Sequence, residues 1–180
     1  LKKNIQHLTL YALSVENYKR NSIYLLFQLI NNFYKKLKNN EYTKLNSKIR
    51  IIGERNNLPK EIISKLIEIE NLTKNNKKLN LNIVFNYGTY NEIIFILKKI
   101  ISSNSRIDEE TFKSFMYLCN SPDPDLLIRT GGYQRLSNFI LLNLSYTELF
   151  FTKTLWPELE INEINNFIKK FESTKRNYGL

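Results

Sequence analysis

Short apolar runs alternate with longer amphipathic segments along the whole chain. The short runs are rich in branched and aromatic residues and end near Gly, Asn, Ser or Thr, a pattern typical of buried parallel strands. It predicts strands at 7–13, 48–53, 81–86, 125–130 and 148–152. Helical periodicity between them predicts helices at 22–38, 60–76, 90–103, 109–119, 134–145 and 160–175. This order predicts an α/β fold: one domain over residues 1–180 with a mainly parallel central sheet flanked by helices.

Two residues mark predicted helix starts. Pro59 precedes the helix expected at 60–76, and its fixed φ suits the first turn of a helix. Asp108 precedes the helix expected at 109–119, where its side chain is suited to capping the free N–H groups. Both residues support the predicted boundaries.

The amino-acid composition limits the classes of partner to be expected. With 180 residues, 42% of them apolar, the chain can bury one sizeable core. The net charge of +10 makes a polyanion the first partner to consider. Lysine and asparagine are frequent everywhere, however, as an AT-rich coding sequence would produce, and aromatic residues do not gather beside the basic ones. We therefore expect no nucleic-acid partner.

The chain has one cysteine and one histidine. A lone Cys119 excludes an internal disulfide framework and a cysteine-based metal cluster, and we expect it to be buried as a small apolar residue. His7 opens an apolar run, which favours a structural role and leaves little basis for Ser-His-Asp chemistry. No apolar run reaches the roughly 20 residues that span a bilayer, and no secretory signal is visible.

Candidate functional residues follow the predicted strands. In open parallel sheets, ligands bind beyond the carboxyl ends of the strands. The first predicted strand is followed by Ser14, Asn17 and Arg20. The fourth ends in Arg129-Thr130-Gly131-Gly132, and Arg135 and Ser137 come next, at the start of the helix expected at 134–145.

The segment from Arg129 to Ser137 is consistent with an anion site. Gly131 and Gly132 permit positive φ and a close approach of a ligand to the backbone. The expected helix would then offer its unpaired N–H groups and the positive end of its dipole. Two guanidinium groups and a hydroxyl suit the oxygens of a diphosphate. A plain connector with both arginines solvated fits these residues equally well, so the residues alone leave the choice open.

A family resemblance extends over essentially the whole chain. The segment PDPDLLIRTGGYQRLSNFILLNLSYTELFFTKTLWPEL (122–159) resembles the signature of the cis-prenyltransferases, the undecaprenyl and dehydrodolichyl diphosphate synthase family. Upstream, LTLYALSVENYKR (8–20) resembles that family's strand and Ser-x-Glu-Asn loop, and KIRIIGE and LNIVFNYG follow in the expected order. The resemblance implies an undecaprenyl diphosphate synthase-like fold. It also implies successive condensation of isopentenyl diphosphate onto an allylic diphosphate, such as farnesyl diphosphate, to make a long-chain cis-polyprenyl diphosphate.

The resemblance also implies roles for the candidate residues. Arg129, Arg135 and Ser137, with the Gly131-Gly132 turn, match positions that hold the diphosphate of isopentenyl diphosphate. Ser14 and Asn17 match the loop beside the reacting carbon, where Asn17 would orient the substrate and assist proton removal. Arg20 matches an arginine that contacts diphosphate. Glu148 matches an acid that helps to hold Mg²⁺, the expected cofactor.

A further expectation concerns the length of the product. The segment 23–34 is apolar around most of its circumference, which fits either a helix buried on two sides or the wall of an apolar tunnel. The family places a tunnel helix in this position. The candidates for chain-length control are Leu25, Leu26, Leu29 and Ile30.

The sequence departs from the family in several respects. Family members begin with a strand and loop close to Met-Asp-Gly-Asn-x-Arg-Trp, and nothing similar occurs here. We therefore expect that the sequence is a fragment lacking this segment, and that it is inactive by itself. Tyr133 stands where the family usually has glutamate, and Tyr18 replaces a common tryptophan.

The resemblance also bears on partners and location. A homodimer and peripheral contact with a membrane are expected, in the cytoplasm or at the endoplasmic reticulum, with organellar targeting left open because an upstream segment is expected. The alternative function is a non-catalytic partner subunit of a heteromeric cis-prenyltransferase. Such subunits usually lose the Arg-Thr-Gly-Gly and Arg-x-Ser elements, and both are intact here.

Overall fold

The computed structural model describes residues 4–20, 23–39, 41 and 46–175. The chain forms two compact units, Leu1–Ser121 (unit 1) and Pro122–Leu180 (unit 2). Strands pair in parallel in both units, which confirms the α/β class with a parallel sheet. The single domain over 1–180 stays a prediction.

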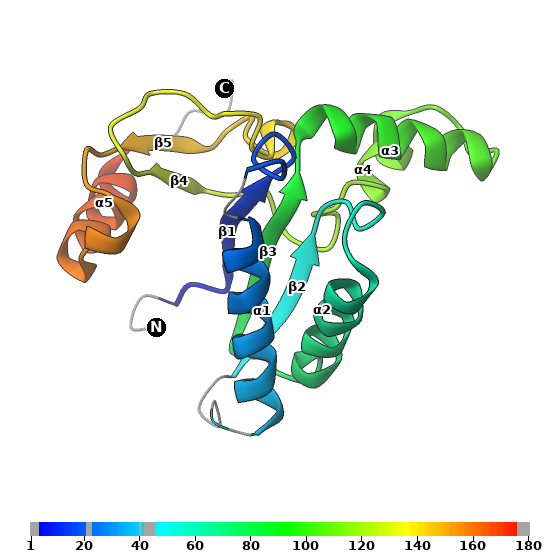
Figure 1. Ribbon diagram of the computed structural model, residues 1–180. Coiled ribbons are helices and arrows are strands. Elements are labelled where there is room, and N and C mark those ends of the chain that lie inside the picture. Colours follow the sequence, from blue (N-terminus) through cyan, green and yellow to red (C-terminus); the bar gives the residue numbers. More distant parts are fainter. Residues whose placement is uncertain (1–3, 21–22, 40, 42–45, 176–180) are drawn as a thin grey trace. The chain divides into compact units, whose positions relative to one another are not determined.

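Unit 1 contains a three-stranded parallel sheet with the strand order β1-β3-β2 (Figure 1). Its strands are β1 (His7–Ser14), β2 (Ser47–Ile52) and β3 (Leu79–Tyr87). Its helices are α1 (Ile23–Lys38), α2 (Lys60–Thr73), α3 (Thr89–Ser102) and α4 (Glu109–Ser114). Parallel neighbours require crossover connections, and α1 and α2 are parts of these crossovers.

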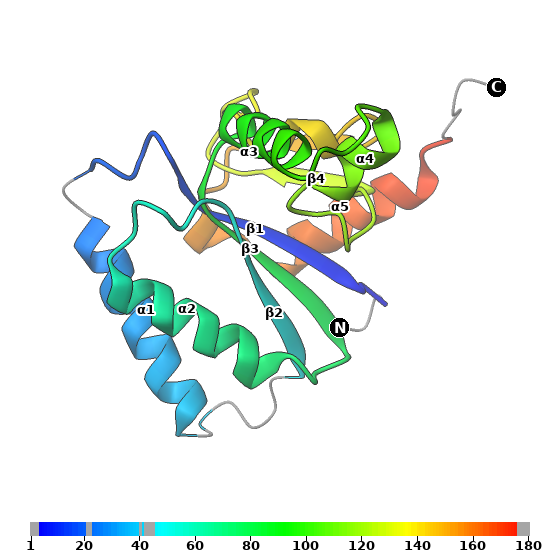
Figure 2. The same ribbon diagram turned by 90° about the vertical axis from the view of Figure 1, so that its right-hand side faces the viewer.

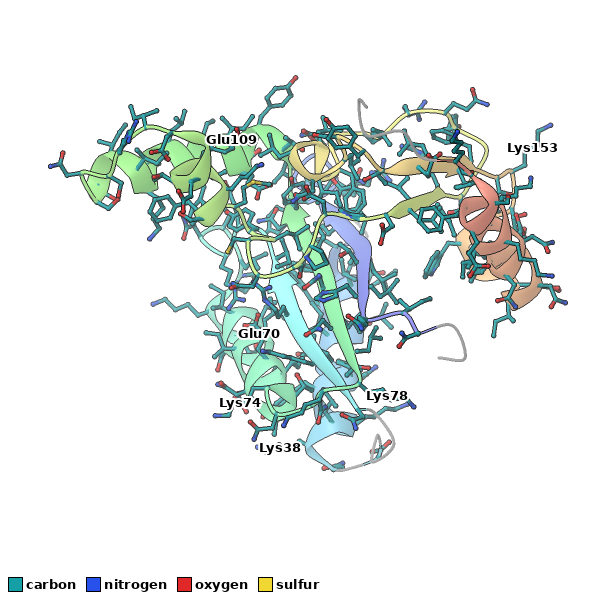
Figure 3. All side chains as sticks on the ribbon, turned by 180° about the vertical axis from the view of Figure 1, so that it is seen from behind. Lys38, Glu70, Lys74, Lys78, Glu109 and Lys153 are labelled. Atoms are coloured by element: carbon teal, nitrogen blue, oxygen red, sulfur yellow. The ribbon has the colours of Figure 1, made fainter. Side chains whose placement is uncertain are left out.

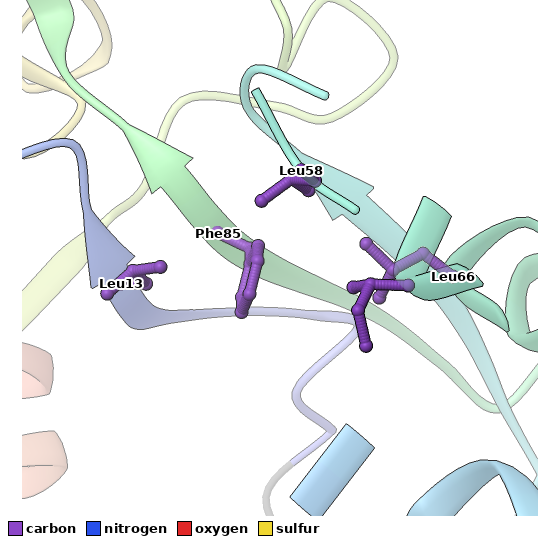
Figure 4. Packing of buried hydrophobic residues seen from close by; sticks show 5 residues of the cluster. Leu13, Leu58, Leu66 and Phe85 are labelled. Atoms are coloured by element: carbon purple, nitrogen blue, oxygen red, sulfur yellow. The ribbon is translucent and has the colours of Figure 1, made fainter. Parts of the chain in front are cut away.

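The main core of unit 1 lies between the sheet and helices α1 and α2, which run side by side on one face of the sheet (Figures 1 and 2). Its buried cluster consists of Leu13, Leu58, Ile62, Leu66 and Phe85 (Figure 4). Helix α1 contributes Ile23, Leu26, Phe27 and Ile30, which have the i, i+3, i+4, i+7 spacing of one helix face. This burial fixes α1 against the sheet.

The opposite face of the same sheet is covered by the chain that follows α4. Side chains alternate between the two faces of a strand, so Arg50 and Asn82 point away from the Phe85 cluster. Arg50 Nη2 donates to the Tyr117 carbonyl at 3.3 Å, and Asn82 Nδ2 donates to Ser121 Oγ at 3.2 Å. The sheet is therefore covered on both faces, as buried parallel sheets require.

Unit 2 contains a two-stranded parallel sheet of β4 (Leu126–Arg129) and β5 (Glu148–Phe151). The chain between them includes the 3₁₀ turn η1 (Leu141–Asn143), and η2 (Trp156–Glu158) precedes helix α5 (Ile161–Ser173). Phe167 of α5 packs on Phe150 of β5, with their ring centroids 5.5 Å apart. This contact anchors the helix to the sheet.

The five predicted strands and five of the six predicted helices are confirmed, with shifts at their ends. The cap at Asp108 is confirmed, because its Oδ1 accepts from the Thr111 N–H at 2.8 Å. Within the described part of the chain, no helix is both long and apolar enough to cross a membrane. Cys119 is exposed, so its expected burial is wrong.

The helix predicted at 134–145 is wrong. Ser137, Asn138 and Ile140 have φ values of 49°, 62° and 35°, which lie in the left-handed region and are incompatible with a right-handed helix. Ile140 is only 2% exposed, and Asn143 donates to Asp123 Oδ1 at 2.8 Å. Burial and a side-chain hydrogen bond therefore override the helical pattern of this apolar run.

Candidate functional site

The loop that contains Gly131 and Gly132 leaves the carboxyl end of β4 and is fixed by backbone hydrogen bonds. Gly131 and Gly132 have φ values of +87° and +80°, as predicted for this turn. The Gly131 N–H donates to the Thr154 carbonyl at 2.9 Å, and the Gly132 N–H donates to the Thr152 carbonyl at 2.8 Å. These two amides are paired within unit 2, and the turn does not lead into the expected α-helix, so neither the glycine amides nor a helix N-terminus is available to a ligand here. The side chains of the loop are therefore the better-supported donors for an anion.

The segment whose carbonyls accept from these amides is held in place by an acid. This acid was not among the residues predicted from the sequence. Glu163 lies in the first turn of α5, and its Oε1 accepts from Thr152 Oγ1 at 2.5 Å and from Thr154 Oγ1 at 3.2 Å. One carboxylate thus fixes both residues on which the glycine turn rests. An acid in the first turn of a helix is also a common dipole effect, so the sequence held no specific signal for this role.

Arg129 organises the charged side of the loop. Its Nη1 donates to Ser137 Oγ at 3.0 Å and to the Arg135 carbonyl. Partial burial, together with the positive charge of Arg135, lowers the pKa of the Arg129 guanidinium. Among the described residues, no carboxylate forms an ion pair with Arg129 or Arg135. Two neighbouring cations without an acid favour an anionic ligand at this loop.

The left-handed backbone of Ser137 gives a testable consequence. An L-residue in this region costs about 1–2 kcal/mol, whereas glycine is tolerated there. Ser137→Ala and Ser137→Gly both remove the hydroxyl that accepts from Arg129, but only glycine relieves the backbone. We expect Ser137→Gly to be the more stable of the two by about 1 kcal/mol in urea unfolding. Equal stability of the two variants would contradict the backbone assignment.

The turn after β1 brings Ser14 and Asn17 together. The Asn17 N–H donates to Ser14 Oγ at 3.2 Å, and the Arg20 N–H donates to the Asn17 carbonyl at 3.1 Å. Ser14 is 7% exposed, Asn17 is half-buried, and Arg20 is exposed. This turn belongs to unit 1, whereas the Arg129 loop belongs to unit 2.

A buried polar network lies behind this turn. The Tyr11 hydroxyl donates to the Tyr87 carbonyl at 3.2 Å, and burial, opposed by a hydrogen bond from Ser14, raises the pKa of Tyr11 to about 12. The Tyr87 hydroxyl donates to Glu92 Oε2 at 2.5 Å, and the Tyr117 N–H donates to Glu92 Oε1 at 2.7 Å. Glu92 is 1% exposed, and burial raises the pKa of its carboxyl. Sequence periodicity gave no sign of this network, because Glu92 looks like an ordinary acid in a first helical turn.

Burial of Glu92 predicts a pH dependence of stability. A raised pKa in the folded state gives stability that is complete below the unfolded pKa of about 4.3 and is lost as pH rises through the folded pKa. Glu92→Gln cannot titrate. We therefore expect its free energy of unfolding, measured in urea, to improve relative to the wild type as pH rises from about 4.

A surface acid gives the control for this trend. Glu109 is fully exposed, and its hydrogen bond from Lys113 lowers its pKa, which is the opposite sign. Glu109→Gln should therefore show a weak opposite trend, because a surface pair contributes little. A constant difference between the wild type and Glu92→Gln at every pH would overturn the expectation for Glu92.

Glu148 begins β5 and lies beside Leu126, whereas Arg129 lies beside Phe151. Three residues of strand separate the two levels by about 10 Å, so the structure does not bring Glu148 to the Arg129 end of this sheet. Among the described residues, no group of three acids, histidines or cysteines could hold a metal ion. Mg²⁺ commonly binds through one or two carboxylates together with phosphate oxygens, and a single acid such as Glu148 fits only that mode.

The four tunnel candidates lie on two sides of α1. Leu26 and Ile30 pack against the buried cluster of unit 1, whereas Leu25 and Leu29 are 48% and 63% exposed. The first pair therefore has a packing role. An apolar surface for a ligand would have to use the second pair, and the tunnel stays a prediction.

A basic hollow lies at the opposite end of the unit 1 strands from Ser14. It has a volume of about 610 Å³ and is lined by Lys48, Lys74, Lys77, Asn75, Asn76 and Asn80. Lys48 and Asn80 lie at the beginnings of β2 and β3. Figure 3 shows Lys38, Lys74 and Lys78 at this same end. The hollow is therefore not the predicted site at the carboxyl ends of the strands.

Known proteins resemble this chain in both sequence and fold. The family described as "Putative undecaprenyl diphosphate synthase" matches residues 1–179. An isoprenyl transferase of Aquifex aeolicus is 42% identical over 178 residues, which is 97% of this chain and 77% of that protein. A probable undecaprenyl diphosphate synthase from Campylobacter jejuni has a solved structure with a TM-score of 0.89 and 33% identity, over 99% of this chain and 86% of that one.

A plant enzyme has a similar fold. The structure of lavandulyl diphosphate synthase from Lavandula x intermedia, in complex with dimethylallyl diphosphate, gives a TM-score of 0.86 at 28% identity, over 98% of this chain and 80% of that one. These matches confirm the undecaprenyl diphosphate synthase-like fold. The chain belongs to the cis-prenyltransferase family.

Proposed function

We propose that the protein is a cis-prenyltransferase that condenses isopentenyl diphosphate onto an allylic diphosphate such as farnesyl diphosphate. In each step, the isopentenyl double bond forms a new carbon–carbon bond to the allylic carbon, the allylic carbon–oxygen bond breaks, and diphosphate and a proton leave. Repetition of this step would give a long-chain cis-polyprenyl diphosphate. The observation that supports this function most directly is the Arg129–Arg135 pair, two cations on one loop that form no ion pair with any acid in the described part of the chain.

The residues of the chain would divide the work as follows. Arg129, Arg135 and Ser137 would bind the diphosphate of isopentenyl diphosphate, and charge-assisted hydrogen bonds from a planar guanidinium fit its oxygens. Gly131 and Gly132 would set the path of the loop. Fixing the diphosphate would hold the nucleophilic alkene in place, and such positioning lowers the entropic part of the barrier.

The turn after β1 would act at the reacting carbon. Asn17 would orient the substrate and assist removal of the proton, and Ser14 would hold the turn through its bond from the Asn17 N–H. Arg20 is exposed and would bind diphosphate. Mg²⁺, held by Glu148 and substrate oxygens, would neutralise charge on the departing diphosphate. The supporting network of Tyr11, Tyr87 and Glu92 would keep the turn rigid.

The direct test is transfer of labelled isopentenyl diphosphate onto farnesyl diphosphate. The 180-residue chain and the longest product of its gene should be compared, with Mg²⁺ and with a chelator. Formation of polyprenyl diphosphate that the chelator abolishes would support both the function and the cofactor. A folded protein that is inactive in every form would instead favour the partner-subunit function, and co-purification with an active prenyltransferase would be the next measurement.

We also propose that the protein forms a homodimer, as the family resemblance implies. We propose that it works at a membrane surface, because its product is a lipid. Sedimentation would measure the oligomeric state. Co-flotation with vesicles that contain polyprenyl phosphate would measure membrane association.

A further inference from the structure

Tyr133 lies next to the glycine turn and makes a specific contact with Arg135. The Arg135 Cζ atom lies 4.0 Å from the centroid of the Tyr133 ring, within the roughly 6 Å range of cation–π attraction. Tyr133 is 57% exposed, so the ring is not part of a buried core. Among the described residues, the Arg135 guanidinium forms no ion pair, so the ring is the attractive partner seen for it.

This contact restricts the motion of the Arg135 side chain before a ligand binds. A free arginine side chain has about 2 kcal/mol of rotamer entropy, part of which is lost when the side chain is fixed on a ligand. An acid at position 133, such as the glutamate usual in the family, could also fix Arg135, but its negative charge would offset part of the positive charge of the loop. An aromatic ring attracts the guanidinium through its quadrupole and leaves the positive charge available.

The difference between an acid and an aromatic ring matters because a second cation lies near Arg135. Burial lowers the pKa of the Arg129 guanidinium, and the positive charge of nearby Arg135 lowers it further. Arg129 is held by its bonds to Ser137 and to the Arg135 carbonyl. The Arg135 guanidinium has no such bond among the described residues, and the Tyr133 ring lies where it can fix that group.

We propose that Tyr133 is a positioning residue, whose ring holds the Arg135 guanidinium ready for the diphosphate of the substrate without neutralising its charge. This inference rests on the proposed function. It assigns a role to a residue that differs from the glutamate usual in the family.

The test compares Tyr133→Leu with Tyr133→Phe in the longest product of the gene, the form that we expect to be active. The leucine variant loses the π face, and we expect a rise of roughly two- to five-fold in KM for isopentenyl diphosphate, with kcat nearly unchanged. The phenylalanine variant keeps the π face and should have a KM close to that of the wild type. Both variants should keep the wild-type Tm, because the side chain is exposed.

A double-mutant cycle shows whether Tyr133 acts through Arg135. In the Arg135→Ala background, Tyr133→Leu should add no further change in KM or in the Kd for inorganic pyrophosphate measured by calorimetry. An equal loss in both backgrounds, a phenylalanine variant as weak as the leucine variant, or a leucine variant equal to the wild type would overturn the inference alone. A wild-type protein that neither binds pyrophosphate nor transfers prenyl groups would overturn the proposed function, and the inference with it.

Discussion

Gly53→Ala is expected to lower the free energy of unfolding by at least about 3 kcal/mol, a large part of the 5–15 kcal/mol typical of a domain. Gly53 follows β2 with a φ of +129°, a region that an L-residue rarely adopts. A Cβ atom at this position would lie 2.1 Å from the Phe85 carbonyl oxygen and 3.1 Å from the Asn86 carbonyl oxygen. Both obstacles are backbone atoms of β3, so no side-chain rotation can relieve the contact.

The consequence should extend to the candidate site. The Glu54 N–H donates to the Asn86 carbonyl at 3.1 Å, and Asn86 Nδ2 donates to the Glu54 carbonyl at 3.0 Å. Moving β2 away from β3 would break these bonds next to Tyr87, whose carbonyl accepts from the Val15 N–H behind Ser14. The alanine variant should therefore lose the order of the Ser14–Asn17 turn as well as stability.

Urea unfolding followed by circular dichroism measures the loss. Gly131→Ala is the matched control, because its φ of +87° is also positive but a Cβ atom added at this position would have nothing within 4 Å. It should cost only about 1–2 kcal/mol, the cost of the left-handed backbone. Equal losses for the two variants would mean that the contact with β3 has no effect.

The elements of unit 1 could be predicted because their pattern and their burial agree. Ile23, Leu26, Phe27 and Ile30 follow the helical period and contact one buried cluster, so the sequence of α1 already describes its packing. The strands around Phe85 are short and rich in branched residues, and there too the sequence pattern agrees with the burial. The ends of the helices and strands were harder to predict. Helix α2, for example, ends at Thr73, whose hydroxyl donates to the Ile69 carbonyl and accepts from the Ile49 N–H. Such a bond between distant segments leaves no local signal.

The connection in unit 2 could not be predicted from periodicity. The apolar run from Leu136 to Leu144 has a helical spacing, yet Ile140 is buried through a left-handed backbone that only tertiary contacts can maintain. The candidate residues could be selected from the sequence, because guanidinium groups beside a Gly-Gly turn suit a diphosphate, and their role in binding stays a prediction. Their supporting residues could not be selected in this way, since Glu163 and Tyr133 act through side-chain contacts that spacing does not show.

Arg129→Ala is expected to lower kcat/KM for isopentenyl diphosphate by roughly 100-fold, mainly through KM. The variant loses a charge-assisted contact worth about 1.5–3 kcal/mol. It also leaves Ser137 Oγ and the Arg135 carbonyl without their donor, so the second half of the loop loses its attachment to β4. Steady-state kinetics with varied isopentenyl diphosphate measures the effect.

Arg129→Lys separates charge from geometry. Lysine keeps the positive charge, but a single ammonium group cannot reproduce the planar fork that bonds to the loop and, in the proposed function, also binds a diphosphate. We expect a loss of roughly ten-fold, between that of alanine and the wild type. Arg106→Ala is the charge-matched control, because Arg106 is 87% exposed and pairs only with Asp108 among the described residues, at 3.3 Å. If Arg106→Ala reduced activity as much as Arg129→Ala, net charge alone would explain the result, and the specific role of Arg129 in diphosphate binding would be lost.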